Sequence, residues 1–399
     1  MARGTFVGAI VLVVSLAGCE ARSSSPSPHA GSPDLTVGFA DTLRIGSHDD
    51  AGTTLTRVGG ILPLPDGGVW VAQTQEQSIR IFDEHGEPTF VVGGPGQGPG
   101  EFMSPGPMGW WGASRDTVWI RDDFARRLNL FDAEGAFVRA EPSIPVEVRD
   151  RAPVSGPEAI YPDSTALGLA RSQAGAGPLS IVRFRVGSAE PERIVATIDR
   201  TSTVQIRFGN EELATGQHPM PDSPIVSFAG PQDRILITDR ATTRDPTRNG
   251  PEITLSSLTG HGDTLWSRRL AYQPTPVSDP EWDSLLSPRI ESFQRFAELE
   301  GRLSSAEAEE AYRASVLPPA HRPPVRSVHM DDSGRILLEW SRPPGASGEL
   351  WLLDPDGEPR VRIEIEGEHE VLGFADPYVW MLELDEFEVP YLIRYRLAS

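Results

Sequence analysis

Residues 69–92 read VWVAQTQEQSIRIFDEHGEPTFVV, and residues 118–138 read VWIRDDFARRLNLFDAEGAFV. The second stretch repeats the first 49 positions later, as shown by Gly86 and Gly135 at the ends of the two Asp-x-x-Gly turns. The runs between the turns alternate apolar and polar residues or are short and β-branched, which is typical of strands. A period of about 40–50 residues built from short strands is typical of propeller blades. The repeat therefore predicts an all-β propeller.

The second strand of each blade, strand B when the strands are lettered A to D from the centre outward, can be followed along the chain. It recurs at 69–71, 118–120, 166–168, 235–237, 336–338 and 379–381, which predicts six blades. The sixth blade lacks a strand D, and natural sheets avoid unpaired edges. We therefore expect Asp41-Thr42-Leu43-Arg44-Ile45 to complete it. The prediction is a six-bladed β-propeller over residues 38–399, closed by an N-terminal strand.

The linker between the first two blades carries a family resemblance. Residues 93–102 read GGPGQGPGEF and are followed by Pro105; Val118-Trp119-Ile120-Arg121-Asp122, Arg127 and Leu130-Phe131-Asp132 continue the pattern. Over about residues 58–140 the chain resembles NHL-repeat six-bladed propellers. The resemblance implies the fold but not the function, since one fold carries many functions.

Residues 1–18 have the pattern of a signal peptide. Arg3 precedes an apolar run over 6–16, too short to span a bilayer. The run ends in Leu16-Ala17-Gly18-Cys19, which resembles the bacterial lipobox, and residues 19–37 predict a lipidated Cys19 and a Ser/Pro-rich tether. We expect anchoring in the cell envelope, to a membrane facing the periplasm or the cell exterior. The alternative is an ordinary secretory signal with a chance cysteine.

The composition excludes several chemistries. The formal net charge is −21, which argues against nucleic acid as a partner because phosphates require a basic face. All 36 basic residues are Arg, so Schiff-base chemistry and a phosphate-loop lysine are excluded. The chain has one cysteine, which excludes an internal disulfide and a thiolate metal site. The serine-hydrolase elbow and the zinc-protease pattern do not occur. The sequence indicates no cofactor and no metal.

Extra residues fall on one side of the predicted disc. Insertions at about 199–222, 240–251 and 276–324 lie in D–A or B–C connections, and these connections emerge on the same face of a propeller. Loops on a rigid scaffold commonly carry binding. We therefore predict that a protein or a small-molecule ligand binds at this insertion-bearing face.

The longest insertion predicts a helical hairpin over about 278–317. Ser278 and Ser304 each begin a capping box, and Pro288 should break the first helix. Ile290, Phe293 and Ala297 share one helical face, which we expect to pack on the disc. The hairpin is either a brace or a lid and docking surface.

Candidate ligand-binding residues gather around the predicted mouth of the channel. Either Trp110 or its neighbour should face the channel. Aromatic faces with bidentate Arg suit sugars, carboxylates or peptide termini. The plainer alternative is that Asp122 and Arg127 brace a loop and that the Trp residues are core. The candidate set is Trp111, Arg121, Asp122, Arg240, Arg326 and His329.

Three hypotheses for the function follow. The first is a lipid-anchored propeller of the cell envelope that acts as a non-catalytic ligand- or protein-binding scaffold. The second is a metal-dependent lyase or lactonase-type enzyme acting on a small extracytoplasmic substrate, because some similar propellers hold a metal in the channel. Such a site needs several His or carboxylates around one ion, and the sequence indicates no such cluster. The third is a purely structural component of an envelope complex.

Overall fold

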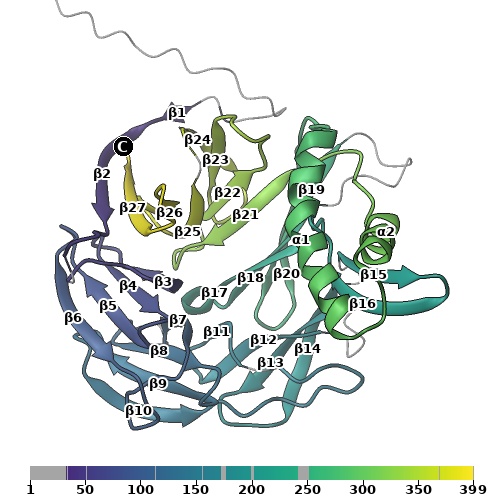
Figure 1. Cartoon of the computed structure of the whole chain (residues 1–399). Helices are drawn as coiled ribbons and strands as arrows, with labels where there is room; N and C mark the ends of the chain where they lie inside the picture. The colour runs from purple at the N-terminus through teal and green to yellow at the C-terminus, as the bar shows by residue number, and fades with distance from the viewer. Residues whose placement is uncertain are drawn as a thin grey trace, which may run out of the picture.

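The computed structural model is a six-bladed β-propeller, as predicted (Figure 1). It describes residues 33, 35–50, 52–112, 114–154, 156–171, 177–198, 202–240, 251–367 and 369–398. The predicted signal peptide, Cys19 and most of the predicted tether lie outside the described residues.

The blades follow one another along the chain, and within each blade the strands run from the centre outward. Blade one consists of β3 (Val58–Pro63), β4 (Val69–Gln73), β5 (Ser78–Phe82) and β6 (Pro88–Gly93). Blade two consists of β7 (Pro105–Trp110), β8 (Thr117–Asp122), β9 (Arg127–Asp132) and β10 (Phe137–Pro142). Blade three consists of β11 (Ala159–Ile160), β12 (Thr165–Ala170), β13 (Leu179–Arg185) and β14 (Pro191–Ile198). The fourth and fifth consist of β17 (Ile225–Ala229), β18 (Arg234–Asp239), β19 (Glu252–Thr259) and β20 (Thr264–Ala271); and β21 (Val325–Met330), β22 (Ile336–Trp340), β23 (Gly348–Leu353) and β24 (Pro359–Ile365). The sixth consists of β25 (Glu370–Ala375), β26 (Tyr378–Leu384), β27 (Pro390–Leu397) and β2 (Phe39–Ile45).

The core lies between the blades. Each second strand is covered on both faces by neighbouring blades, so it is apolar almost throughout, and all of β4 is buried. Trp70, Trp119 and Trp380, on the second strands of blades one, two and six, are at most 2% exposed. The turns follow the predicted chemistry: the Asp132 carboxylate accepts the Ala136 amide at 2.7 Å, and Gly135 has φ +88°.

The N-terminal strand closes the ring, which confirms that prediction. β2 pairs antiparallel with β27, with Thr42 opposite Tyr395 and Ile45 opposite Leu392. Ile45 is 2% exposed and packs between blades six and one. A short strand before it, β1 (Thr36–Val37), pairs parallel with β24 of blade five and was not predicted. The N-terminal segment therefore joins two blades.

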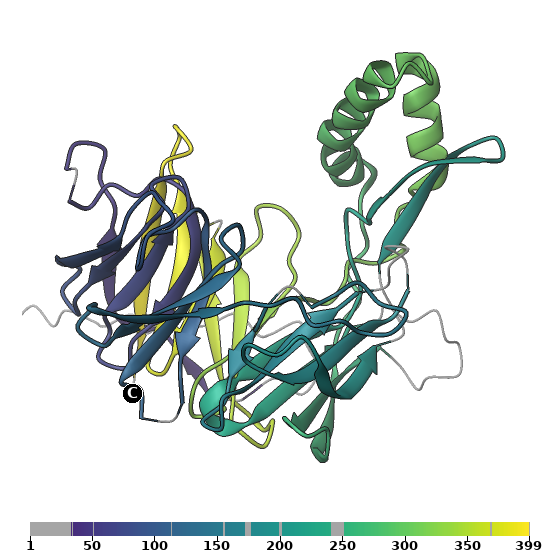
Figure 2. The ribbon, with the colours of Figure 1, turned by 90° about the horizontal axis from the view of Figure 1, so that it is seen from below.

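The helical hairpin does not pack on the disc, so that expectation is wrong. Helices α1 (Asp279–Leu299) and α2 (Ser305–Ser315) share a core with the hairpin of β15 (Thr203–Phe208) and β16 (Glu211–Gln217). Ile290, Phe293 and Ala297 do share one buried face, but its partners come from the insertion lobe itself, among them Ile206 on β15 and Tyr312 on α2. Figure 2 shows the assembly rising from one side of the ring. We call α1, α2, β15 and β16 the insertion lobe.

The ends and the interior of α1 differ from the prediction. The helix continues through Pro288 without a break, because Leu286 and Ile290 on either side are both buried in the lobe core. That packing offsets the roughly 3 kcal/mol that an interior proline costs. The Ser278 side chain makes no capping bond, whereas the predicted box at Ser304 and Glu307 is present.

Candidate functional site

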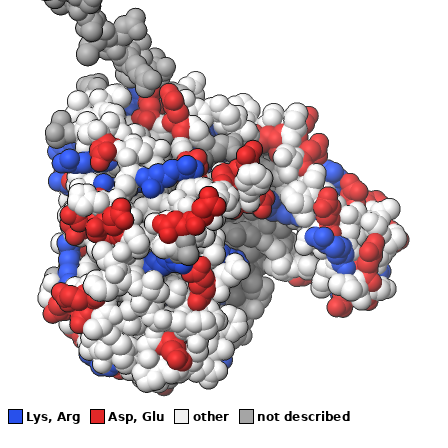
Figure 3. All heavy atoms as spheres, turned by 60° about the vertical axis from the view of Figure 1, so that its left-hand side comes forward, with Lys and Arg blue, Asp and Glu red and all other residues white. Residues whose placement is uncertain are grey.

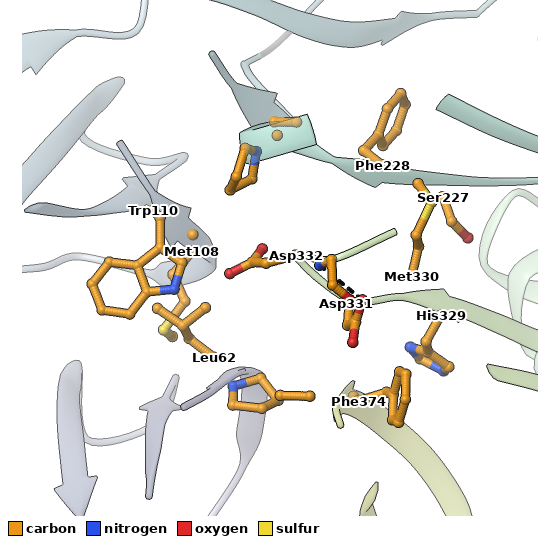
Figure 4. Close-up of a pocket in the computed structure, with 18 of the residues that line it drawn as sticks. Leu62, Met108, Trp110, Ser227, Phe228, His329, Met330, Asp331, Asp332 and Phe374 are labelled. Atoms are coloured by element: carbon orange, nitrogen blue, oxygen red, sulfur yellow. Dashed lines mark hydrogen bonds between the residues drawn. The ribbon is translucent and has the colours of Figure 1, made fainter. Parts of the chain in front are cut away.

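A cavity of about 540 Å³ occupies one end of the central channel (Figure 4). We call it the channel cavity. Innermost strands face one another across an axis, so the side chains that point inward are not covered by a neighbouring blade. Every blade contributes one or more of them to the wall, among them Leu62, Trp110, Ile160, Phe228, His329 and Phe374.

The channel cavity lies at the end of the ring opposite the insertion lobe. Its rim comes from the connections between first and second strands, including Pro65, Arg115, Pro231, Asp332 and Asp376. The insertion lobe leaves from connections at the other ends of these strands and rises from that side (Figure 2). The cavity is therefore on the other side of the disc from the insertion-bearing face.

Most charged groups in the wall are matched in pairs, and the remaining carboxylate, that of Asp331, accepts the Ser333 hydroxyl at 2.7 Å and the Arg335 backbone N–H at 2.9 Å. Three ion pairs involve lining residues: Arg115 with Asp332, Arg335 with Asp376, and Glu158 with Arg121. The Arg115 and Asp332 side chains approach to 3.2 Å. Burial raises the pKa of Asp332, and the Arg115 guanidinium acts in the opposite direction. Because each guanidinium already has a carboxylate and the Asp331 carboxylate already has hydrogen-bond donors, the cavity favours an uncharged ligand over an ion.

Unpartnered polar atoms are the groups that a ligand could satisfy. His329 Nε2 and Trp110 Nε1 are buried and have no hydrogen-bond partner in the structure, and both side chains line the cavity. Burial lowers the pKa of His329 to about 4, while a bond to the Val371 backbone raises it. Since Nε2 has no partner, the nitrogen that bonds Val371 is Nδ1, and the neutral ring offers the Nε2 lone pair as an acceptor. Figure 4 shows both residues at the edge of the cavity.

Two of the predicted site residues, both on β8, hold the connections that precede blades two and three in place. Arg121 is buried and donates from Nη1 to the Pro157 carbonyl at 2.9 Å. Asp122 is fully buried and accepts the backbone N–H groups of Met103 at 2.9 Å and Ser104 at 3.1 Å. Asp122 thus braces the linker that precedes β7.

Arg240 and Arg326 lie on the insertion-bearing face. Arg240 is buried and donates to the Ser223 carbonyl at 2.9 Å and the Val325 carbonyl at 2.6 Å. Arg326 contacts Glu339 and lines a separate cleft. The structure therefore does not bring the six predicted residues together.

The two neighbouring tryptophans are divided between the channel and the space between blades. Trp110 lines the channel cavity, whereas Trp111 packs against the core between blades two and three, with Arg139 5.6 Å from its ring centre. Of the six predicted residues, His329 is the one that lines the channel cavity. Apart from Trp110 and His329, the lumen residues on innermost strands were not predicted. Their strands are short or contain Gly and Pro, so neither alternation nor β propensity marks them; β11 has two residues.

The side chains do not fit the channel metal of the enzyme hypothesis. Within the part of the chain that the structure describes, no three His, Cys, Asp or Glu side chains are placed to hold one ion. In the cavity wall, Asp332 and Asp376 each face an arginine instead.

Comparison with known proteins gives the fold. No family model matches the sequence, and no curated protein matches it. A member of the DUF4221 family from Bacteroides vulgatus is similar in structure at 9% identity, with 90% of this chain and 97% of the other covered and a TM-score of 0.50. A protein from Bacteroides fragilis that carries the name of an exported protein has 10% identity, coverage of 92% and 99%, and a TM-score of 0.47. Virginiamycin B lyase from Staphylococcus aureus has 12% identity, coverage of 90% and 99%, and a TM-score of 0.40. At such identities the likeness concerns the fold alone.

Proposed function

We propose that this chain is a lipid-anchored propeller of the cell envelope that binds a small, uncharged ligand in its channel cavity and does not transform it. The observation that carries the proposal is the cavity itself. Its volume of about 540 Å³ falls within the roughly 300–1,000 Å³ that small-molecule sites occupy. All six blades build its wall, so the site is rigid and formed before the ligand arrives.

The lining suggests the chemistry of the ligand. Phe228, Phe374 and Trp110 provide aromatic faces, and Met108 and Met330 provide adaptable apolar contacts. The paired charges disfavour an ionic ligand. A ring-shaped or planar apolar molecule with a hydroxyl or amide donor for His329 Nε2 and an acceptor for Trp110 Nε1 would satisfy both unpartnered atoms.

The envelope location follows from the N-terminal sequence. Leu16-Ala17-Gly18-Cys19 ends an apolar run of signal-peptide length. Among the described residues, no helix is long and apolar enough to cross a membrane. An acyl anchor on Cys19 would hold the propeller at the membrane surface.

Native mass spectrometry of protein purified from its own source, followed by a thermal-shift screen of uncharged ring compounds, tests the proposal. We expect a bound or stabilising compound whose effect is lost in Met330→Trp, since the larger side chain fills the cavity. Leu299→Trp is the control, because Leu299 is 88% exposed on α1.

Two results would contradict the proposal. If Met330→Trp keeps the wild-type shift with that compound, the ligand binds elsewhere. If wild-type protein converts the compound to a product, the non-catalytic part of the proposal fails while binding stands.

A further inference from the structure

A second cavity, about 520 Å³ in volume, lies on the insertion-bearing face. We call it the insertion cleft. Met220 and Leu285 line it from the side of the insertion lobe, and Arg342 and Leu384 line it from blades five and six. It shares no lining residue with the channel cavity. Any ligand it takes is therefore separate from the one proposed above.

The lining of the insertion cleft is rich in arginine, although the chain as a whole is acidic. Arg322, Arg326 and Arg342 line it, with Glu370 as the carboxylate residue among the lining groups. Arg322 pairs with Glu281 of α1, and its Nε atom is buried without a partner in the structure. This pair fixes the start of blade five to the insertion lobe, so the two walls of the cleft are held together.

Arg326 lines the cleft and is oriented by two hydrogen bonds to the protein. Its Nη1 atom lies 3.2 Å from Glu339 and donates to the His369 carbonyl at 2.9 Å. Glu339 is buried and also accepts the Ser327 hydroxyl at 2.7 Å. Both Arg326 bonds use one nitrogen, and 44% of the side chain is exposed. The guanidinium is thus oriented by the protein while much of it stays open to a ligand.

Of the three arginines in the insertion cleft, Arg342 has no carboxylate partner among the described residues and donates to the Ala346 carbonyl at 3.1 Å, so it can take one negative charge. Glu281 pairs with Arg322 and Glu339 pairs with Arg326. The lining carboxylate of Glu370 is exposed at the start of β25 and makes no ion pair among the described residues. A planar carboxylate matches the arginine fork with two parallel hydrogen bonds. A dianionic phosphate would bring more charge than the remaining arginine can offset.

The rest of the insertion cleft is apolar. Leu382, Leu384, Pro343 and Met220 line it, and Leu384 is 56% exposed. An exposed leucine beside oriented arginines favours a ligand with an anionic end and an apolar body. We infer that the insertion cleft binds a carboxylate whose adjoining group is apolar, either an aliphatic carboxylic acid or the free C-terminus of an apolar peptide.

Isothermal titration at pH 7 tests this inference on the intact protein. The probes are octanoate, octanol, and the peptide acetyl-Ala-Leu-Leu as free acid and as C-terminal amide. We expect octanoate or the peptide acid to bind at least about tenfold more tightly than octanol or the amide, since hydrogen bonds to charged groups are the stronger ones. The tighter of the two acids identifies the source of the carboxylate.

Substitutions in the lining test whether the acid binds in the insertion cleft. Arg342→Ala and Leu384→Asp should each weaken the binding of the preferred acid by about tenfold or more. Leu384 is exposed, so its substitution tests the site without disturbing the core. Arg269→Ala on β20, exposed and outside the cleft lining, and Met330→Trp in the channel cavity should bind as wild type. Equal binding of octanol and octanoate, or wild-type affinity in both cleft variants, would overturn the inference.

Discussion

Arg183 and Arg394 occupy the same position in blades three and six and fasten each blade to the next one around the ring. Arg183 on β13 lies opposite Leu167, and Arg394 on β27 lies opposite Trp380, the corresponding residues of two second strands. Each guanidinium lies 4.8 Å from the ring centre of a tyrosine in its own blade. Arg183 donates to the Gly260 carbonyl of blade four at 3.2 Å.

Arg394 makes the equivalent contacts at the closure of the ring. Its Nη1 atom donates to the carbonyls of Gly67 at 2.7 Å and Glu84 at 2.6 Å, both in loops of blade one. A flat guanidinium can stack on a tyrosine and bond two carbonyls at once, whereas an ammonium group is a point charge. A basic side chain at these two blade junctions therefore has to be arginine.

Arg394→Lys should lower the free energy of unfolding by about 1–3 kcal/mol, because buried carbonyls lose their donors. Chemical denaturation measures it. Arg396→Lys is the matched control, since Arg396 is on the same strand with its side chain exposed. Equal stability of both variants would show that the Arg394 contacts contribute little.

At the scale of elements, β2 and the insertion lobe are both additions to the repeated blades, and they bury their apolar residues in different ways. β2 completes a blade and buries Ile45 between blades six and one. The insertion lobe instead buries its apolar stripe within itself, on residues from two separate insertions. One segment closes the ring, and the other forms a small core beside it.

Deletion of residues 38–47 should lower the melting temperature and cause aggregation, because β27 becomes an unpaired edge. Differential scanning calorimetry and light scattering measure these effects. Deletion of 35–37 is the control, since it removes β1 and leaves β2. An unchanged melting temperature with a monodisperse monomer after the first deletion would contradict the closing role of β2.

At the scale of the whole molecule, the ring separates two candidate sites. The channel cavity opens on the side of the ring opposite the insertion lobe, whereas the insertion cleft lies next to the lobe. The chain carries 57 acidic and 36 basic residues, and Figure 3 shows both signs interspersed over one face of the molecule. Such a surface favours solubility.

Cys19→Ala should release the protein from membranes into the soluble fraction, because the thiol that would carry the acyl chains is gone. Cell fractionation with mass spectrometry of the mature N-terminus measures this. A serine-to-alanine change in the tether, Ser24→Ala, should leave the wild-type distribution intact. A Cys19→Ala protein that stays with membranes would refute the anchor.

The sequence by itself determined the ring, because blade structure is local. Strand runs and Asp-x-x-Gly turns such as the one ending at Gly135 depend on neighbours a few positions away. Their repeat predicted the blade number, and the missing outer strand of blade six predicted closure by residues 41–45. The capping box at Ser304 is equally local.

Tertiary structure alone decided the sites. Whether Trp110 or Trp111 faces the lumen depends on the pleat of a strand rich in Gly and Pro, which has no clear alternation. Arg121 and Arg240 look like ligand contacts in sequence, yet both are buried against backbone carbonyls from segments distant in the chain. The apolar face of α1 indicates that another apolar surface packs on this helix, but the sequence does not specify which surface that is. The sequence gives the chemistry of each side chain. The group that a side chain contacts depends on which distant segments the ring brings together.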